Sequence, residues 1–172
     1  MRERGEAPPP SSAGLVVSAQ EAADFARRLQ RAGVAVAFTN GCFDLLHAGH
    51  VAYLEQARAM AGALIVGVNG DRSVRRLKGP GRPVVPQEDR ARIVAALRAV
   101  DRVVIFEEET AATLIELIRP NLYVKGADYA SRQLPEEPAA RAVGARIVLV
   151  PLLEGRSTTA LIRRLRGEGP AG

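Results

Sequence analysis

With 172 residues, 47% of them hydrophobic and 25% charged, the chain is long enough for one globular domain with a sizeable core. No apolar run approaches the roughly 20 residues of a membrane span, and a single cysteine excludes an internal disulfide or a zinc site built from several cysteines. The net charge of +5 suits anionic ligands, whereas aromatic residues, at 4%, are too few for a platform that stacks single-stranded nucleic acid.

The two ends of the chain differ in composition from its middle. Residues 1–14 carry charges and three consecutive prolines without an apolar core, so we expect a disordered leader rather than a secretory signal. A single domain is expected over 15–168, with a flexible tail over 169–172. The lone thiol, Cys42, fits a reducing cytoplasm, and packing in a turn is favoured over a role as nucleophile.

Helical and strand patterns alternate along the rest of the chain. The capping box Ser18-Ala19-Gln20-Glu21 starts a helix that runs to about Arg31 and is ended by Gly33. Buried strands are expected over 34–38, 63–68, 103–106, 122–124 and 146–150. Helices are expected over 51–62, 72–77, from 86 onward, over 110–118 and 135–143, and after 155–159. Short apolar strands that alternate with helices predict an α/β, Rossmann-like, doubly wound domain with a mainly five-stranded parallel sheet and helices on both faces.

Five unusual segments lie where such a fold binds ligands. Residues 39–50, 69–71, 78–83, 125–128 and 155–159 all follow a strand or lie in a loop after one. Ligands of doubly wound sheets bind beyond the carboxyl ends of the strands. The segments therefore predict one site at one edge of the sheet, although 69–71 can equally be a simple turn.

The chain has two histidines, His47 and His50, and both lie in the first of these segments. Their spacing at the start of a helix places both imidazoles on one side, and Gly49 between them lets backbone approach a phosphate. The helix N-terminus offers free N–H groups to an anion, and an imidazole can stabilise negative charge as it builds up. Gly41 permits a tight turn close to a ligand. Histidines that merely cap or pack are the weaker alternative to this phosphate site.

The string His47-Ala48-Gly49-His50 resembles the HxGH signature of the nucleotidyltransferase superfamily. The longer string over 38–51 is similar to the adenylyltransferases that activate D-glycero-β-D-manno-heptose 1-phosphate for ADP-heptose synthesis. Segments 76–83, 88–90, 124–129 and 154–159 also match that family, in the same order. The family's domain is often fused behind a sugar kinase, and since this sequence has no kinase half we expect a stand-alone version.

The resemblance implies that AMP is transferred from ATP to the heptose 1-phosphate and that pyrophosphate is released. The sugar phosphate is already an anion, so catalysis requires positioning and charge stabilisation rather than a strong base. Mg²⁺ is expected to be carried by the nucleotide, because no carboxylate cluster suggests a dedicated cage. The expected partners are ATP and the sugar phosphate, not nucleic acid or a membrane; a homo-oligomer is left open. The product usually feeds lipopolysaccharide core assembly.

The resemblance also implies roles for individual residues. The expected catalytic residues are His47, His50 and Lys78. The expected nucleotide-binding and phosphate-binding residues are Thr39, Asn40, Gly41, Phe43, Gly49, Arg90, Lys125, Gly126, Asp128, Ser157, Thr158 and Thr159. In this scheme the lysine neutralises phosphate charge from its loop, and the last three residues offer hydroxyls and helix N–H groups.

Several of these residues have plainer alternatives. Lys78 can be a solvated loop lysine, and Arg90 can pair with a neighbouring acid on a helix surface. Ser157 can be only an N-cap, and Asp128 only a turn former. For Asp44 we favour a structural role, in which its carboxylate holds the turn by accepting hydrogen bonds from backbone amides.

Other functions compete with heptose activation. Related glycerol-3-phosphate cytidylyltransferases carry Arg-Thr-Glu-Gly where this chain has 152–155 as Leu-Leu-Glu-Gly, which argues against that branch and leaves the role of Arg156 open. A truncated tRNA synthetase is disfavoured, because the chain is short and has no matching lysine loop. A non-catalytic nucleotide-binding module is disfavoured because both histidines and Lys78 are present. A nucleic-acid-binding role rests on charge alone.

Overall fold

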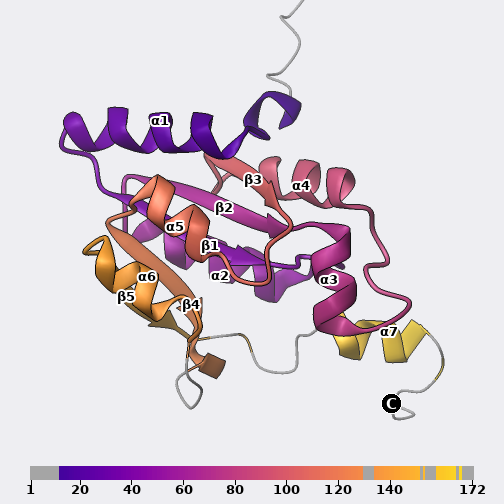
Figure 1. The fold of residues 1–172 in the computed structure, drawn as a ribbon. Coiled ribbons are helices and arrows are strands. Elements are labelled where there is room, and N and C mark those ends of the chain that lie inside the picture. The colour runs from indigo at the N-terminus through magenta and orange to yellow at the C-terminus, as the bar shows by residue number, and fades with distance from the viewer. Residues whose placement is uncertain (1–11, 130–133, 152, 154–157, 166, 168–172) are drawn as a thin grey trace, which may run out of the picture.

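A computed structural model describes residues 12–129, 134–151, 153, 158–165 and 167 (Figure 1). The elements in chain order are η1 (Ser12–Leu15), α1 (Ala19–Arg31), β1 (Val36–Gly41), α2 (Ala48–Ala59), β2 (Ala63–Asn69), α3 (Asp71–Lys78), α4 (Gln87–Ala95), β3 (Arg102–Phe106), α5 (Ala112–Ile118), β4 (Leu122–Gly126), η2 (Ala127–Tyr129), α6 (Glu137–Ala142), β5 (Arg146–Val150) and α7 (Thr158–Leu165). None of the helices in the described part of the chain is long and apolar enough to cross a membrane.

The described strands form one sheet in the order β3-β2-β1-β4-β5, and every neighbouring pair is parallel. The chain moves outward from β1 to β3, returns to the other side of β1 and continues through β4 to β5. This reversal between β1 and β4 is the topological switch point of a doubly wound fold. The predicted fold class is confirmed.

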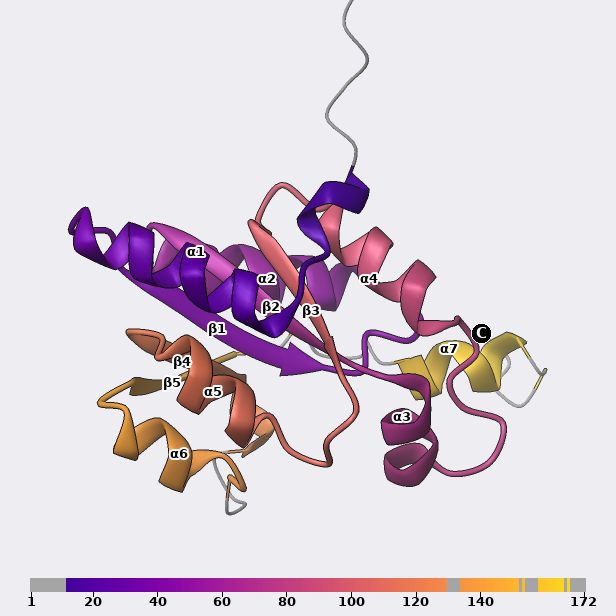
Figure 2. The same cartoon turned by 45° about the horizontal axis from the view of Figure 1, so that its top comes forward.

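Helices cover the sheet on both faces, because alternate strand residues point to opposite sides. One core contains Ile65 and Phe38 with apolar residues of α1, α5 and α6. The other contains Leu64 and Val66 with apolar residues of α2 and α4. Figure 2 shows α1, α5 and α6 in front of the sheet and α2 behind it. The two cores leave the carboxyl ends of the strands open for a site.

The N-terminal part of the domain begins earlier than the sequence suggested. The capping box is present, with the Ser18 hydroxyl accepting from the Glu21 N–H at 3.2 Å and the glutamate accepting from the Ser18 N–H at 2.8 Å. Ahead of it, η1 includes residues 12–14 of the expected leader, and the Val17 N–H donates to the Val103 carbonyl of β3 at 2.9 Å. Leu15 and Val16 pack against the core, which explains why the structured part of the chain starts before Ser18. Residues 1–11 and 168–172 lie outside the described residues.

Two strands end later than the sequence predicted. Strand β1 continues to Gly41, beyond the expected end at Phe38, because residues 39–41 pair with Val66–Val68 of β2. Gly41 is thus a strand residue rather than part of a tight turn, and the left-handed residue is Phe43, with φ of 47°. A Cβ on Gly41 would lie 3.1 Å from the Phe43 ring, so the glycine makes room for that ring. Asn69 likewise ends β2 instead of forming a turn.

Candidate active site

A cavity of about 510 Å³ opens at the carboxyl ends of the strands, beside the switch point. Most of the expected site residues come together in its lining, which joins loops after β1, β2 and β4 with the start of α7. The expected residues that line it are Asn40, Gly41, Phe43, His47, Gly49, His50, Lys78, Lys125, Gly126, Asp128, Thr158 and Thr159.

The two histidines lie together at the start of α2. Their ring centroids are 3.9 Å apart with an angle of 30° between the rings, so both imidazoles do lie on one side of the helix. His47 is also the N-cap of α2, because its Nδ1 accepts from the Gly49 N–H at 3.1 Å. A neutral His47 that accepts at Nδ1 carries its proton on Nε2. His47 therefore both caps the helix and lines the cavity.

The surroundings of His50 keep its imidazole neutral. Burial, and then the nearby His47, lower the pKa of His50 from 6.5 to about 4. The Phe43 ring contributes to this burial, with ring centroids 5.4 Å apart. Within the described part of the chain, the buried Nδ1 of His50 has no hydrogen-bond partner. Such an atom is costly unless a water or substrate atom satisfies it.

Lys78 is the last residue of α3 and reaches the cavity from an exposed position. The chain then turns away through Gly79 and Gly81, whose φ values of 89° and 81° suit glycine. Burial raises the pKa of the Cys42 thiol, although Lys78 opposes this. A protonated thiol is a poor nucleophile, which agrees with the packing role expected for Cys42.

The start of α7 closes one side of the cavity. The Thr158 hydroxyl donates to the Leu45 carbonyl at 3.1 Å and so ties α7 to the loop that carries the histidines. Thr159 lines the same cavity. Ser157 and Arg156 lie outside the described residues, so their expected roles stay predictions.

On the other side of the cavity, Lys125 lies at the end of β4. Its Nζ donates to Asn40 Oδ1 at 3.4 Å, and the Tyr123 hydroxyl donates to the same oxygen at 2.7 Å. Burial lowers the pKa of Lys125, while the carboxylates of Glu136 and Asp128 oppose the shift. The lysine and Asp128 both face the cavity, as expected.

Thr39 does not fit the phosphate contact expected of it. Its side chain is fully buried and does not line the cavity. Its hydroxyl lies 2.6 Å from the Tyr53 hydroxyl, which itself donates to the Val124 carbonyl at 2.8 Å. Because a tyrosine hydroxyl has one proton, the threonine must be the donor of this pair. Thr39 therefore ties α2 to β1 and β4 instead of holding substrate.

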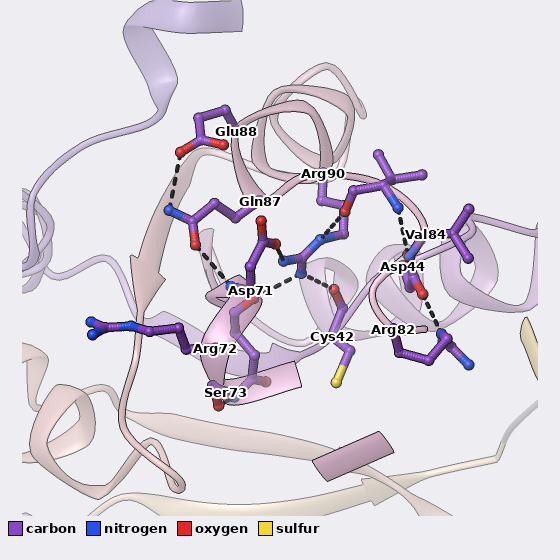
Figure 3. A network of polar contacts seen from close by, with 12 residues as sticks. Cys42, Asp44, Asp71, Arg72, Ser73, Arg82, Val84, Gln87, Glu88 and Arg90 are labelled. Atoms are coloured by element: carbon purple, nitrogen blue, oxygen red, sulfur yellow. Dashed lines mark hydrogen bonds and ion pairs between the residues drawn. The ribbon is translucent and has the colours of Figure 1, made fainter. Parts of the chain in front are cut away.

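Arg90 fits neither of its expected roles, as Figure 3 shows. It is 1% exposed and lies behind the cavity rather than in its lining. Its guanidinium donates to the carbonyls of Cys42 at 2.5 Å, Asn69 at 2.7 Å and Val85 at 2.8 Å. It also pairs with Asp71 at 2.7 Å rather than with the acids beside it on α4. Arg90 thus joins the ends of β1 and β2 to α3.

Residues 38–164 match the family described as Cytidylyltransferase-like. The chain belongs to this family of nucleotidyltransferases. It is 53% identical to the "Bifunctional protein HldE" of Magnetococcus marinus over 79% of this chain and 28% of that protein. The protein of the same name from Acidiphilium cryptum is 52% identical over 91% of this chain and 33% of its own length. The chain therefore spans about a third of the length of these relatives.

A solved structure supports the fold of this cytidylyltransferase-like domain. It is described as the crystal structure of the lipopolysaccharide core biosynthesis protein from Thermoplasma volcanium. The two share a TM-score of 0.58 at 21% sequence identity, over 72% of this chain and all of the other. At this identity the likeness establishes the fold alone.

Some lining residues of this cytidylyltransferase-like site were not singled out from the sequence. They are Tyr53, Leu77, Arg82, Glu109, Thr110, Pro135, Glu136 and Leu153. Arg82 stands in the same Gly-Pro-rich segment as Lys78, and that position was a usable signal. Glu136 is 5% exposed and accepts from the Ala111 N–H at 3.3 Å. That contact joins the segments before α5 and α6, and no local pattern predicts it.

Proposed function

We propose that the chain transfers the AMP moiety of ATP to D-glycero-β-D-manno-heptose 1-phosphate, giving ADP-heptose and pyrophosphate. The observation that carries this proposal is the pair His47 and His50 at the start of α2, in one cavity with Lys78. The choice of ATP and a heptose rests on the resemblance of segments 38–51 and 76–83 to heptose 1-phosphate adenylyltransferases.

In the proposed reaction, a phosphate oxygen of the sugar attacks the α-phosphorus of ATP. The bond from that phosphorus to the oxygen bridging to the β-phosphate breaks, and pyrophosphate leaves with the electron pair. The attacking oxygen is already anionic, so no side chain has to remove a proton. The rate enhancement then comes from alignment and from donors placed where charge increases.

The donors of the cavity suit that task. The Nε2 proton of a neutral His47 lies on the ring edge opposite the nitrogen that caps the helix, and His47 lines the cavity. The N-terminus of α2 adds its positive dipole end. Lys78 supplies a full positive charge from the C-terminal end of α3. The low pKa of His50 makes it a neutral donor at physiological pH.

We propose that the nucleotide brings Mg²⁺ with it. In the described residues no three His, Cys, Asp or Glu side chains come together as a metal-ligating group. We therefore propose an ion held by phosphate oxygens and water rather than by a cage of protein ligands. When bound, the ion neutralises charge on the triphosphate. A cytoplasmic location follows from the use of ATP as substrate, and a role in lipopolysaccharide assembly from the same resemblance.

A pyrophosphate-release assay tests the proposal. Purified protein is given ATP or CTP with a panel of acceptors that includes both anomers of the heptose 1-phosphate, other sugar 1-phosphates and glycerol 3-phosphate. We expect the highest kcat/KM with ATP and the β-heptose phosphate. Turnover with CTP and glycerol 3-phosphate would assign the chain to the cytidylyltransferases instead. Nucleotide binding without turnover of any pair would indicate a non-catalytic module.

A further inference from the structure

Arg82 is a second cation in the loop that begins at Lys78. Its side chain lines the cavity and is 15% exposed. Its Nε donates to Asp44 Oδ2 at 2.5 Å, as Figure 3 shows. Among the described residues, its two terminal nitrogens donate no hydrogen bond. One edge of the guanidinium is therefore fixed, while the edge that carries Nη1 and Nη2 has its donors available.

Asp44 connects this arginine to the histidine segment. Its side chain is 1% exposed and lies three residues before His47. Its second oxygen, Oδ1, accepts from the Val84 N–H at 2.8 Å and from the Val85 N–H at 2.9 Å. The expected structural role of Asp44 is thus realised, but across to residues 84–85 rather than within its own turn. The carboxylate of Asp44 therefore fixes both the backbone at Val84 and Val85 and the side chain of Arg82.

A guanidinium held in this way is well suited to phosphate. Its planar donors match two oxygens of one phosphate, and a lysine ammonium cannot reproduce that geometry. Fixing the side chain in advance reduces the conformational entropy that binding would otherwise cost. The ion pair also neutralises Asp44, whose free carboxylate would repel anionic substrates from this cavity.

We propose that Arg82 binds a phosphate group of a substrate through its terminal nitrogens, and that Asp44 positions it. The inference rests on the proposed function only in assuming phosphate-bearing substrates. The phosphate can belong to ATP or to the sugar 1-phosphate, and the two arms of the experiment separate these sources.

The test compares Arg82→Gln, Asp44→Asn, the double variant and the control Arg75→Gln. Arg75 is exposed on α3 and does not line the cavity, so its variant matches the lost charge. Asp44→Asn keeps an oxygen for the two backbone amides and replaces the oxygen that accepts from Arg82. One arm measures the affinity for ATP and for inorganic pyrophosphate by calorimetry, without sugar. The other measures KM for the sugar 1-phosphate.

We expect Arg82→Gln to weaken one of these constants by about tenfold, as for a lost hydrogen bond to a charged group. Asp44→Asn should cause a smaller loss in the same constant. The double variant should be no worse than Arg82→Gln, because the two residues act through one contact. Arg75→Gln should change neither constant. Arg82→Lys keeps the charge and replaces Arg82→Gln in the comparison if the glutamine variant unfolds. Its affinity should lie between those of wild type and Arg82→Gln.

The inference is overturned if folded Arg82 variants bind ATP, pyrophosphate and sugar phosphate as Arg75→Gln does. Arg82 would then be only the counter-ion of Asp44. Additive losses in the double variant would contradict the positioning role of Asp44. If the wild-type protein shows no turnover with heptose 1-phosphate but Arg82→Gln still weakens pyrophosphate binding, the proposed function fails and this inference stands.

Discussion

The two walls of the cavity are built in different ways. One wall carries His47, His50, Lys78 and Arg82, all from the chain between β1 and α4. The other wall carries Lys125 among acidic residues that follow β3 and β4, which are Glu109, Asp128 and Glu136. The first is predominantly cationic and suits phosphate, whereas the second suits groups that donate hydrogen bonds, such as sugar or ribose hydroxyls.

The support behind the walls differs as well. The cationic wall rests on buried Arg90 and Asp44, whose hydrogen bonds measure 2.5 to 2.9 Å. On the acidic wall, Lys125 and Tyr123 both donate to Asn40, at 3.4 Å and 2.7 Å, and the Ala111 N–H donates to Glu136 at 3.3 Å. The comparison teaches that the phosphate side is built on buried ion pairs, which organise it before substrate arrives.

The largest effect is expected from removing the support of the cationic wall. Arg90→Met should lower the free energy of unfolding by about 3–5 kcal/mol, because it leaves three carbonyls and Asp71 without their buried partner. Urea denaturation measures this. Arg92→Met, on the exposed side of the same helix, should stay within about 0.5 kcal/mol of wild type. A similar loss in both variants would contradict the role of Arg90 as a buried hub.

The next largest effect is expected from removing the His47 imidazole from the cationic wall. Asparagine is a good N-cap, so His47→Asn should preserve α2 and remove only the ring donor. We expect kcat in the pyrophosphate-release assay to fall by about 10²–10³-fold, as for loss of one transition-state donor, with little change in stability. His47→Ala should show the same loss and an added destabilisation of about 1 kcal/mol from the missing cap. Full activity in His47→Asn would remove the histidine from the mechanism.

A smaller effect is expected on the acidic wall. Glu136→Gln keeps an oxygen for the Ala111 N–H but removes the negative charge. If this wall accepts from sugar hydroxyls, KM for the sugar 1-phosphate should rise by about fivefold, since a charged acceptor forms the stronger hydrogen bond. The matched control is Glu137→Gln, whose carboxylate pairs with Arg141 and does not line the cavity. Equal KM values for both variants would leave the acidic wall without a part in acceptor binding.

The smallest effect concerns pH. The pKa of His50 is about 4 in the folded chain, below the 6.5 of an unperturbed histidine, so protonation favours unfolding. The stability due to the neutral imidazole is complete above pH 6.5 and declines as the pH falls toward 4. Urea denaturation at pH 7, 6 and 5 should therefore show a steeper loss for wild type than for His50→Asn. Parallel curves for the two proteins would contradict a neutral, buried His50.

The alternation of apolar strands and helices was enough to predict the fold, because it depends on local pattern. Strand ends were less predictable, since they depend on pairing between distant segments. Thr39 extends β1 because Val66 lies beside it in β2, and nothing near position 39 indicates this. Similarly, the position of the segment after η1 depends on the contacts of Val16 and Val17 with Val103 of β3.

In the site, too, local patterns were predictable and contacts between distant segments were not. The histidine spacing and the Lys78 segment identified much of the cationic wall. The family resemblance implied that Thr39 and Arg90 bind nucleotide or phosphate. The structure buries both against partners from other elements, Tyr53 for the threonine and three carbonyls with Asp71 for the arginine. Glu136 shows the converse, because its place in the cavity arises from the neighbouring positions of α5 and α6.

The contact of Val16 and Val17 with β3 has a consequence for how copies of this chain meet. Strand β3 is at one end of the sheet, and outer strands with open N–H and carbonyl groups recruit other chains into mixed sheets. Val16 forms a parallel bridge with Val103, and the Val17 N–H takes up the Val103 carbonyl. The segment covers this edge of the sheet, so shortening the chain to Ser18 should favour aggregation even though every residue that lines the cavity would remain.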